Sequence, residues 1–261
     1  MITAYNRNVV HEPLIRYATL AEGLAAPAFG DSRLAWGDFT PTASVNWVER
    51  PADGAGLRRA AYGGLRVLSA ANAGLNVRSC IEALRTRLIG HLAEPLTSTM
   101  VGANSVMQAA WDAAALGRIE GCVNESTNVI TRILAAQRPS AAFLDFRKED
   151  NAESWWFCEL VILDALSQWW VCDDTSLRAE VRRAVCRSAE FHLHETQPDH
   201  ATMHPWACGA MMLHPPARPL ADWMLGAMQV QFAGGLDAIS ALLLQNASHL
   251  LRQTVAVESQ E

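Results

Sequence analysis

The sequence almost lacks lysine: Lys148 is the only one among 21 basic residues, and the others are arginines. Acidic residues number 27, the formal charge is −6, and no basic cluster interrupts this balance. A protein that binds nucleic acid needs a basic surface to neutralise phosphates. The composition therefore argues against nucleic acid as a partner.

Long apolar runs are missing as well. No uncharged stretch reaches the roughly 18 residues of a membrane-spanning helix, so no membrane span is predicted. The polar opening of the chain does not resemble a signal peptide. The six cysteines are scattered without a CxxC pair, mostly within apolar helical patterns where a reduced cysteine acts as a small hydrophobic residue. We expect a reducing, cytoplasmic location without a disulfide framework.

The common catalytic and nucleotide-binding motifs are also absent. The chain has no G-x-S-x-G nucleophile turn, no P-loop and no G-x-G-x-x-G stretch. These absences exclude the most frequent hydrolase and nucleotide-binding functions.

Half of the sequence is hydrophobic, which suffices for a large core in a single domain. Residues 1–56 are predicted to form an irregular N-terminal segment packed on that core, with one helix over 12–24. Residues 26–56 contain many Pro and Gly residues together with Trp36, Phe39 and Trp47. A short strand pair is a further alternative for that stretch.

From residue 57 to 255 the apolar residues follow a helical period, and strand alternation is nearly absent. An all-α domain is therefore predicted. Its expected helices span residues 57–72, 76–92, 104–119, 122–137, 152–171, 176–195, 205–213, 219–232 and 235–255.

These helices alternate in character. Those beginning near 57, 104, 152 and 205 have few charges, whereas those near 76, 122 and 176 carry arginines on one face. The pattern predicts inner helices buried on all sides and outer helices with one solvated face. Asn104, Asn151 and His200 mark successive inner-helix starts 47 and 49 residues apart, so antiparallel helical hairpins are predicted at a period of about 48 residues.

This layout of elements resembles the α/α-toroid superfamily, in which an inner ring of helices is wrapped by an outer ring. Terpene cyclases and protein prenyltransferases share it. The resemblance implies an active site at the mouth of the ring, near the inner-helix starts. The chain departs from those families at Asp173 and Asp174, which lack the third acid of a DDxxD motif. Its four or five hairpins are also fewer than a closed ring needs. The ring is therefore expected to be open, or to be completed by the N-terminal region or a second subunit.

The densest chemistry lies between Glu190 and His214, which contains five of the eight histidines. A histidine at a helix N-terminus is favoured in its neutral form by the helix dipole and can transfer protons beside a carboxylate. The predicted catalytic residues are therefore His200, His204, Asp199 and Glu153. His192 and His194 are expected to cap an outer helix or lie on the surface, and His214 to mark a helix end.

A metal site is the weaker alternative. His200, His204 and Cys208 are spaced i, i+4 and i+8, so on one continuous helix they would line a face that could hold zinc. Pro205 argues against this geometry, because proline favours the first helical position and would place His204 at the N-cap. No cofactor is otherwise expected.

A second group of side chains is predicted to line the substrate site: Asn104, Asn151, Trp155, Trp156, Glu159 and Trp206. Glu159 is the most unusual, because a carboxylate inside an apolar helix requires a partner or a raised pKa. Arg58, Arg59 and Arg66 are the expected partners. The alternative to a functional role for Glu159 is a structural ion pair. The alternative to substrate contact for the tryptophans is a place in the core.

The sequence thus predicts a small cytoplasmic enzyme with acid–base residues at the mouth of an apolar helical cavity. Cyclisation, isomerisation or elimination on a hydrophobic small molecule fits such a site. The alternative is a non-catalytic helical-repeat protein for binding or assembly. Under either hypothesis a homodimer is expected through the apolar C-terminal helices, which include residues 236–251 with Met224, Met228 and Phe232.

Overall fold

The computed structural model describes residues 4–30, 63–94, 96, 99–147, 150–195, 204–231 and 235–260. Most of these residues are α-helical and none of them forms a strand; Thr99 and Asp145 make an isolated bridge. The all-α prediction is confirmed. No helix in the described part of the chain is both long and apolar enough to cross a membrane.

The helices follow the predicted pattern closely from residue 63 onward. The bounds are α1 Ala4–Gly30, α4 Gly63–Asn72, α5 Arg78–Ala93, η2 Met100–Gly102, α6 Ala103–Glu120, α7 Asn124–Ala136, α8 Ala152–Ser167, α9 Thr175–Glu195, α11 Cys208–Leu213, η3 Pro215–Ala217, α12 Arg218–Gln231 and α13 Ala238–Glu258.

Side-chain caps set several of these starts. Asn151 accepts a hydrogen bond from the backbone N–H of Ser154 at the start of α8, and Asp237 accepts one from Ser240 at the start of α13. Asp174 accepts one from Leu177 in the first turn of α9, as its sequence position predicts. Each cap satisfies a backbone donor that the helix itself leaves open.

The N-terminal region differs from its prediction. The helix expected over 12–24 extends over Ala4–Gly30 and contains both Pro13 and Pro27, so residues 26–30 are not irregular. Its buried face, which includes Leu14 and Tyr17, explains the difference, because tertiary packing stabilises a helix beyond its local propensity. Residues 31–62, with Trp36, Phe39 and Trp47, lie outside the described residues, as do the first residues of the helix predicted from 57.

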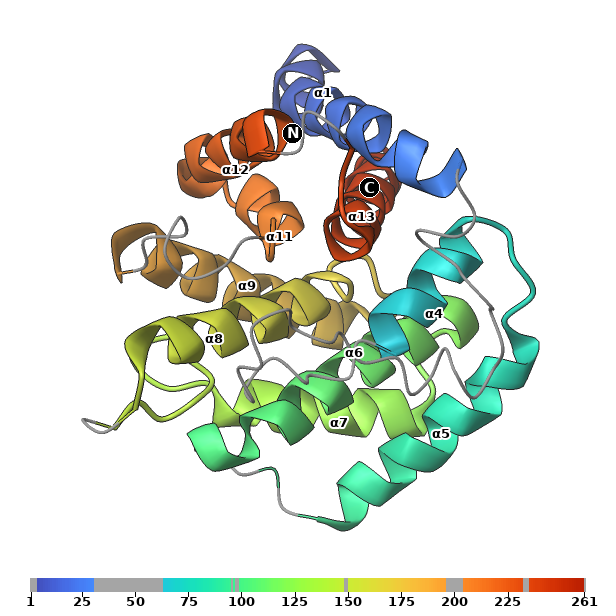
Figure 1. Cartoon of the computed structure of the whole chain (residues 1–261), viewed down its shortest axis with the longest axis vertical. Coiled ribbons are helices and arrows are strands. Elements are labelled where there is room, and N and C mark those ends of the chain that lie inside the picture. The colour runs from blue at the N-terminus through green and yellow to red at the C-terminus, as the bar shows by residue number, and fades with distance from the viewer. Residues whose placement is uncertain are drawn as a thin grey trace.

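The inner helices contact one another in a closed circuit (Figure 1). Helix α4 contacts α6, α6 contacts α8, α8 contacts α11, α11 contacts α13, and α13 contacts α4. Outside this circuit, α5 and α7 pack on α6, α9 packs on α8, and α12 packs on α11. The alternation of inner and outer helices is confirmed, since α6 and α8 are buried nearly all round while α5, α7 and α9 bury one face.

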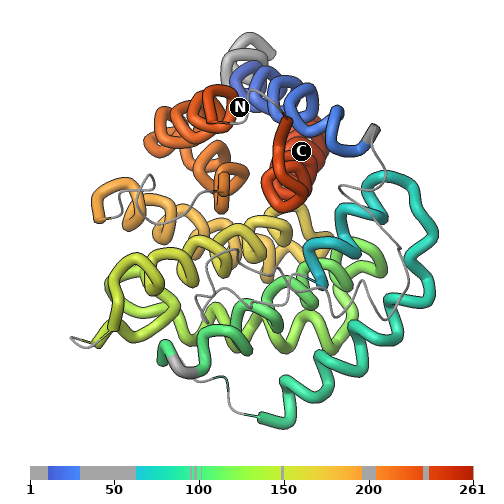
Figure 2. Tube along the Cα trace, viewed as in Figure 1, coloured from blue at the N-terminus to red at the C-terminus, as the bar shows by residue number. Residues whose placement is uncertain are grey.

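Helix α1 provides the outer partner of α13 (Figure 2). His11 of α1 lies 3.4 Å from Glu258 near the end of α13, and Arg252 lies 2.6 Å from Glu22. The two helices are therefore antiparallel. Helix α1 thus covers one face of α13.

A constant hairpin period is not confirmed. Helices α6, α8 and α11 begin at 103, 152 and 208, which are 49 and 56 residues apart, and α13 follows only 30 residues after α11 begins.

The apolar residues of the C-terminal helices pack inside this chain. Leu243, Leu244 and Leu250 of α13 are buried, as are Met224 and Met228 of α12. Their burial removes the basis for the predicted dimer interface, because the same apolar surface is already covered by α1, α4 and α11. Phe232 lies outside the described residues.

Close helix approach explains the small residues of the inner helices. Gly64 of α4 lies so near α6 that a Cβ atom there would come within 2.3 Å of the Trp111 carbonyl oxygen. Aromatic rings fill the space between α6, α8 and α11: Trp206 lies 6.4 Å from Trp111 and 6.0 Å from Phe157 between ring centroids. Trp206 is fully buried, so its predicted role in a substrate wall is replaced by a role in the core.

Candidate functional site

The residues predicted at the inner-helix starts do not form one described cluster. Asn104 and Glu153 are exposed, and the exposed Asn151 caps α8. Asp199 and His200 lie outside the described residues. No described contact places a partner group beside Glu153 that would support its predicted acid–base role. The described role of Asn151 is to cap α8.

His204 is held against the start of α13. Its Nδ1 atom lies 3.0 Å from the Ser240 hydroxyl oxygen and 3.5 Å from a carboxylate oxygen of Asp237. Burial acts to raise the pKa of Asp237, but hydrogen bonds from His204 and Ser240 outweigh it and hold this pKa at about 2. His204 therefore joins the segment before α11 to the start of α13 through polar contacts.

The geometry required for the zinc alternative is not formed. Ala207 has a left-handed conformation with φ 60°, and α11 begins only at Cys208, so His204 and Cys208 do not share a helix face. The prediction that Pro205 opens this helix is wrong for the same reason. Burial also raises the pKa of the Cys208 thiol to about 12, which disfavours the thiolate that binds metal. No three His, Cys, Asp or Glu side chains in the described residues are arranged to hold a metal ion.

Glu159 has different partners from those predicted. Its carboxylate accepts backbone N–H bonds from Phe143, at 2.8 and 3.0 Å, and from Leu144, at 2.5 Å. The loop that presents these donors turns through Ala141, which has φ 75°. Burial raises the pKa of Glu159 to about 8 despite these bonds and the charge of Arg138. Glu159 is therefore a structural link between α8 and this loop. The prediction of Arg66 as its partner is wrong, because Arg66 lies near Cys80 and the charge that acts on Glu159 is that of Arg138. Arg58 and Arg59 lie outside the described residues, so their pairing with Glu159 stays a prediction.

Two further buried carboxylates were not singled out from the sequence. Asp112 of α6 binds Arg87 of α5 through two hydrogen bonds of 2.7 and 2.5 Å. Burial raises its pKa to about 6, and Arg87 opposes that shift. Asp164 of α8 accepts a hydrogen bond from the backbone of Ala207, and burial raises its pKa to about 8. Their signal in the sequence is a lone acid within an apolar helix, as it was for Glu159.

His192 is also placed differently from its prediction. It is fully buried near the end of α9, and its ring lies 5.2 Å from the ring of Phe191. Burial lowers the pKa of His192 to about 3, so the side chain is neutral. The expected capping or surface role is wrong for His192, whereas His194 is exposed as predicted.

The structure brings together three residues from the two ends of the histidine-rich stretch. Glu190 and His194 lie one turn apart on α9, and His214 is the C-cap of α11, as its predicted helix end implies. His214 Nε2 lies 2.6 Å from one carboxylate oxygen of Glu190, and His194 Nε2 lies 3.1 Å from the other. Hydrogen bonds from His214 and then His194 lower the pKa of Glu190. We call these three residues the histidine–glutamate cluster.

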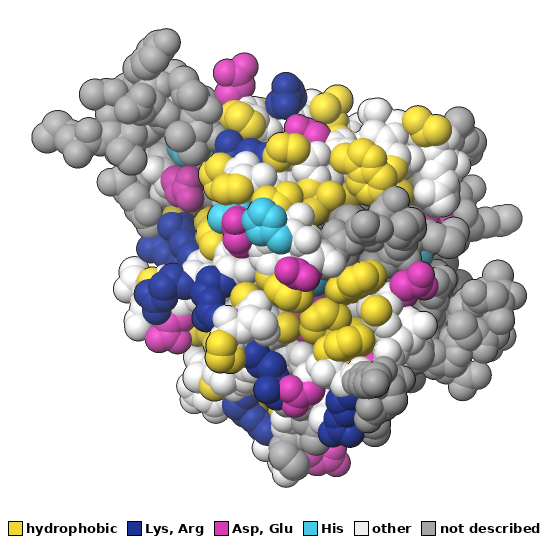
Figure 3. Space-filling model, turned by 90° about the vertical axis from the view of Figure 1, so that its left-hand side faces the viewer, with side chains coloured by type: hydrophobic (Ala, Val, Ile, Leu, Met, Phe, Trp, Pro, Cys, Tyr) yellow, Lys and Arg dark blue, Asp and Glu magenta, His cyan; other side chains and the backbone are white. Residues whose placement is uncertain are grey.

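The cluster borders a cavity of about 500 Å³, which we call the groove. Apolar and small side chains dominate its other walls: Ser140, Ala141, Cys186 and Phe191, with the stems of Arg187 and Glu195 at the edges. Figure 3 shows histidines and an acidic side chain gathered beside hydrophobic side chains on the face that contains α9. The groove thus combines an apolar wall with titratable groups.

Aromatic packing supports the groove from behind. Trp155 contacts Phe191 edge to face at 5.8 Å and Phe146 at 5.1 Å between ring centroids. Its indole N–H donates to the Leu144 carbonyl at 3.3 Å. Trp155 is buried, and Trp156 is half-buried and packs on the core. Trp155 thus supports Phe191 in the wall of the groove, and neither tryptophan lines the groove itself.

The cluster has the chemistry of an acid–base pair. When Nε2 carries the proton that binds Glu190, Nδ1 of a neutral imidazole is a proton acceptor. A carboxylate that orients an imidazole in this way fixes its tautomer and stabilises its protonated form. The Glu190–His194 spacing of i, i+4 was visible in the sequence, but the approach of His214 depends on how α11 packs on α9.

Comparison with protein-family models, with curated proteins and with solved structures finds no match to this chain. The toroid resemblance therefore stays a prediction based on element order, and a function has to be inferred from the side chains themselves.

Proposed function

We propose that this protein is a small enzyme that holds an apolar small molecule in the groove and moves a proton with the histidine–glutamate cluster. The observation that supports it is the Glu190 carboxylate, bonded to two imidazoles at the edge of a largely apolar cavity. Isomerisation, elimination and cyclisation reactions all include a proton transfer to or from carbon, so this cluster suits the reaction types expected from the sequence.

The three residues have different roles in this proposal. His214 is the base, because its side chain is only 16% exposed and its bond to Glu190 is the shorter of the two. His194, with a side chain 66% exposed, exchanges protons with solvent. Glu190 orients both rings and balances their charge. The apolar wall of Phe191 and Cys186 holds the substrate body and excludes water.

The test is solvent deuterium incorporation. A panel of apolar cyclic and open-chain ketones, incubated with the protein in deuterium oxide, reports proton exchange at the carbon beside the carbonyl. We expect at least one ketone to exchange faster than in buffer. His214→Asn should slow this exchange by about 10²- to 10⁴-fold, the range for removal of a general base. Glu190→Gln should slow it less, because His214 keeps a hydrogen-bond partner.

His249→Asn is the matched control, because His249 lies on α13 and does not line the groove. Its exchange rate should equal that of the wild type. The proposal fails if no ketone in the panel exchanges faster than in buffer, or if His214→Asn leaves the rate unchanged.

The alternative is a non-catalytic assembly protein, and one observation favours it. Trp223 and Val230 of α12 are 48% and 83% exposed, and Ile15 and Leu20 of α1 are 44% and 45% exposed. Large exposed apolar side chains on neighbouring helices are typical of an interface. Sedimentation velocity separates the two hypotheses: concentration-dependent association that Trp223→Ser abolishes, together with no deuterium exchange, would support assembly.

A further inference from the structure

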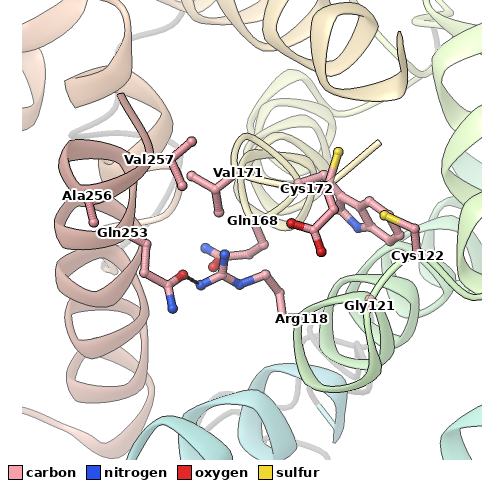
Figure 4. Close-up of a pocket in the computed structure, with 12 residues that line it drawn as sticks. Arg118, Gly121, Cys122, Gln168, Val171, Cys172, Gln253, Ala256 and Val257 are labelled. Carbon is pink, nitrogen blue, oxygen red and sulfur yellow. Dashed lines mark hydrogen bonds between the residues drawn. The ribbon is translucent and has the colours of Figure 1, made fainter. Parts of the chain in front are cut away.

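A second cavity, of about 390 Å³, lies between the ends of α6, α8 and α13 (Figure 4). We call it the end cavity. Its polar groups are Arg118, Gln168, Asp173 and Gln253, and its apolar wall includes Val171 and Val257. It shares no lining residue with the groove, so the two are separate sites. Its volume is within the usual range for small-molecule pockets.

Close packing of two inner helices shapes the floor of this cavity. Gly117 lies so near the indole of Trp169 that a Cβ atom there would come within 2.4 Å of the ring. This contact brings the last turn of α6 against the turn that follows α8. Arg118 and Gln168 therefore enter the cavity from adjacent elements, and Figure 4 shows Arg118 reaching toward Gln253 of α13, to which it donates a hydrogen bond.

Among the described residues, Arg118 has no anion beside it. Its guanidinium donates to the amide oxygen of Gln253, and no carboxylate in this part of the chain contributes to its pKa. Its Nε atom is buried and has no hydrogen-bond partner among those residues. Burial lowers the pKa of Arg118 to about 10, and no neighbouring charge offsets the shift. A buried cation that lacks a counter-ion is unfavourable, so the protein retains a charge here that an anionic ligand would neutralise.

Asp173 adds a charge of the opposite sign. It lines the same cavity from the exposed turn before α9, yet it makes no ion pair with Arg118. The amide of Gln168, a residue only 1% exposed, lines the same cavity. A cavity with separated positive and negative groups, two amides and a small apolar wall matches a ligand that has both charges and a short hydrocarbon body.

We propose that the end cavity binds a small zwitterion of the amino-acid type, with its carboxylate on Arg118 and its ammonium group on Asp173. The fork of guanidinium donors suits a carboxylate, which Arg binds through two parallel hydrogen bonds. Gln168 and Gln253 provide further donors and acceptors for the same two groups. Val171 and Val257 contact the side chain of the ligand and restrict its size.

The experiment uses the full chain and measures both the unfolding temperature and calorimetric binding. The probes are the common α-amino acids, each tested separately, with acetate and inorganic phosphate as simple anions. We expect a small aliphatic amino acid to raise the unfolding temperature and to bind with a stoichiometry of one. Arg118→Met, which keeps the alkyl stem, should weaken binding by about 10- to 100-fold, the effect of losing charge-assisted hydrogen bonds.

Asp173→Asn is the second variant, and it changes an exposed turn, so the fold should tolerate it. It should weaken amino-acid binding but not acetate binding. Arg252→Met is the matched control, because Arg252 pairs with Glu22 outside the cavity. Without ligand, Arg118→Met should unfold at or above the wild-type temperature, since it removes an unpaired buried charge; a purely structural arginine would give a lower temperature.

Three results would overturn the proposal. The first is that no amino acid binds to the wild type. The second is that phosphate or acetate binds and amino acids do not, which would exclude a zwitterion. The third is amino-acid binding that neither Arg118→Met nor Asp173→Asn changes.

Discussion

The carboxylates inside the inner helices and the carboxylate on α9 have opposite surroundings. Asp112, Glu159 and Asp164 are buried, and each binds a donor that the fold itself supplies. Glu190 is on the surface, and its partners are two imidazoles beside a cavity. Burial raises the pKa of the three interior acids, whereas hydrogen bonds from histidines lower that of Glu190. The interior acids therefore connect elements, while Glu190 is the carboxylate to which we assign a part in the proposed proton transfer.

The strongest test of this contrast is the removal of Glu159. Glu159→Ala leaves two buried backbone N–H groups without acceptors and opens a cavity, so we expect a loss of about 3–5 kcal/mol in the free energy of unfolding. Urea unfolding followed by circular dichroism measures it. Glu159→Gln keeps one acceptor oxygen and should lose less than half as much. A loss below about 1 kcal/mol for Glu159→Ala would show that the loop is held by other contacts.

The Asp112–Arg87 pair should give the next largest effect. Asp112→Asn leaves the Arg87 charge without its carboxylate at a fully buried position, and we expect a loss of about 2–3 kcal/mol. Arg87→Met alone should cost a similar amount. The double variant should lose less than the sum of the two, and a double-mutant cycle from urea unfolding measures the coupling. Additive losses would mean that the two side chains act independently.

Much of this fold was predictable from the sequence, because helix periodicity and caps are local signals. Asn151 is an example, since it caps the helix whose start it was expected to mark. The length of α1 was not predictable, because its prolines disfavour a helix locally and tertiary packing, chiefly against α13, stabilises it. The partners of Glu159 were not predictable either, because they are backbone N–H groups, which every residue except proline has whatever its side chain.

The candidate site was predictable only in part, for a related reason. The sequence marks the stretch that ends at His214 as the densest in chemistry, but its helix pattern favours His200 and His204 as the proton-transfer residues. Helix α11 begins three residues later than expected, at Cys208, so His204 and Cys208 do not share a helix face. Glu190 and His194 are two of the three cluster residues, and their spacing on α9 brings them together, whereas the contact with His214 depends on the packing of α11 on α9.

The interior acids should also make the stability of the protein depend on pH. The pKa of Glu159 and of Asp164 is about 8 in the folded state, well above the ordinary range for carboxyl groups. Between that ordinary range and pH 8 the folded state holds protons that the unfolded chain has released. Folding in this range therefore takes up one proton at each group, so the free energy of unfolding falls as the pH rises, by about 1.4 kcal/mol per pH unit for each group.

Urea unfolding at pH 6, 7 and 8 checks this dependence. Glu159→Gln has no proton to lose at this position, so its stability should fall less steeply than that of the wild type. The difference in slope should be about 1.4 kcal/mol per pH unit. Equal slopes for the two proteins would mean that Glu159 is ionised throughout this range in the folded state.

The smallest effect on stability is expected at the surface cluster. The pKa of Glu190 is lowered chiefly by the hydrogen bond from His214, at 2.6 Å, and next by that from His194, at 3.1 Å. His214→Asn should therefore raise this pKa more than His194→Asn does, and carbon-13 NMR titration of the Glu190 carboxyl group measures both.

A carboxyl group whose pKa is lowered by folding stabilises the folded state at pH values above its ordinary pKa. This stabilisation is lost as the pH falls, which is the opposite of the pH dependence expected for Glu159. Because Glu190 is solvated, the urea midpoint near neutral pH should hardly change. A large loss of stability in His214→Asn would mean that the cluster is a structural link, like the interior acids. That result would contradict the proton-transfer role proposed for the cluster.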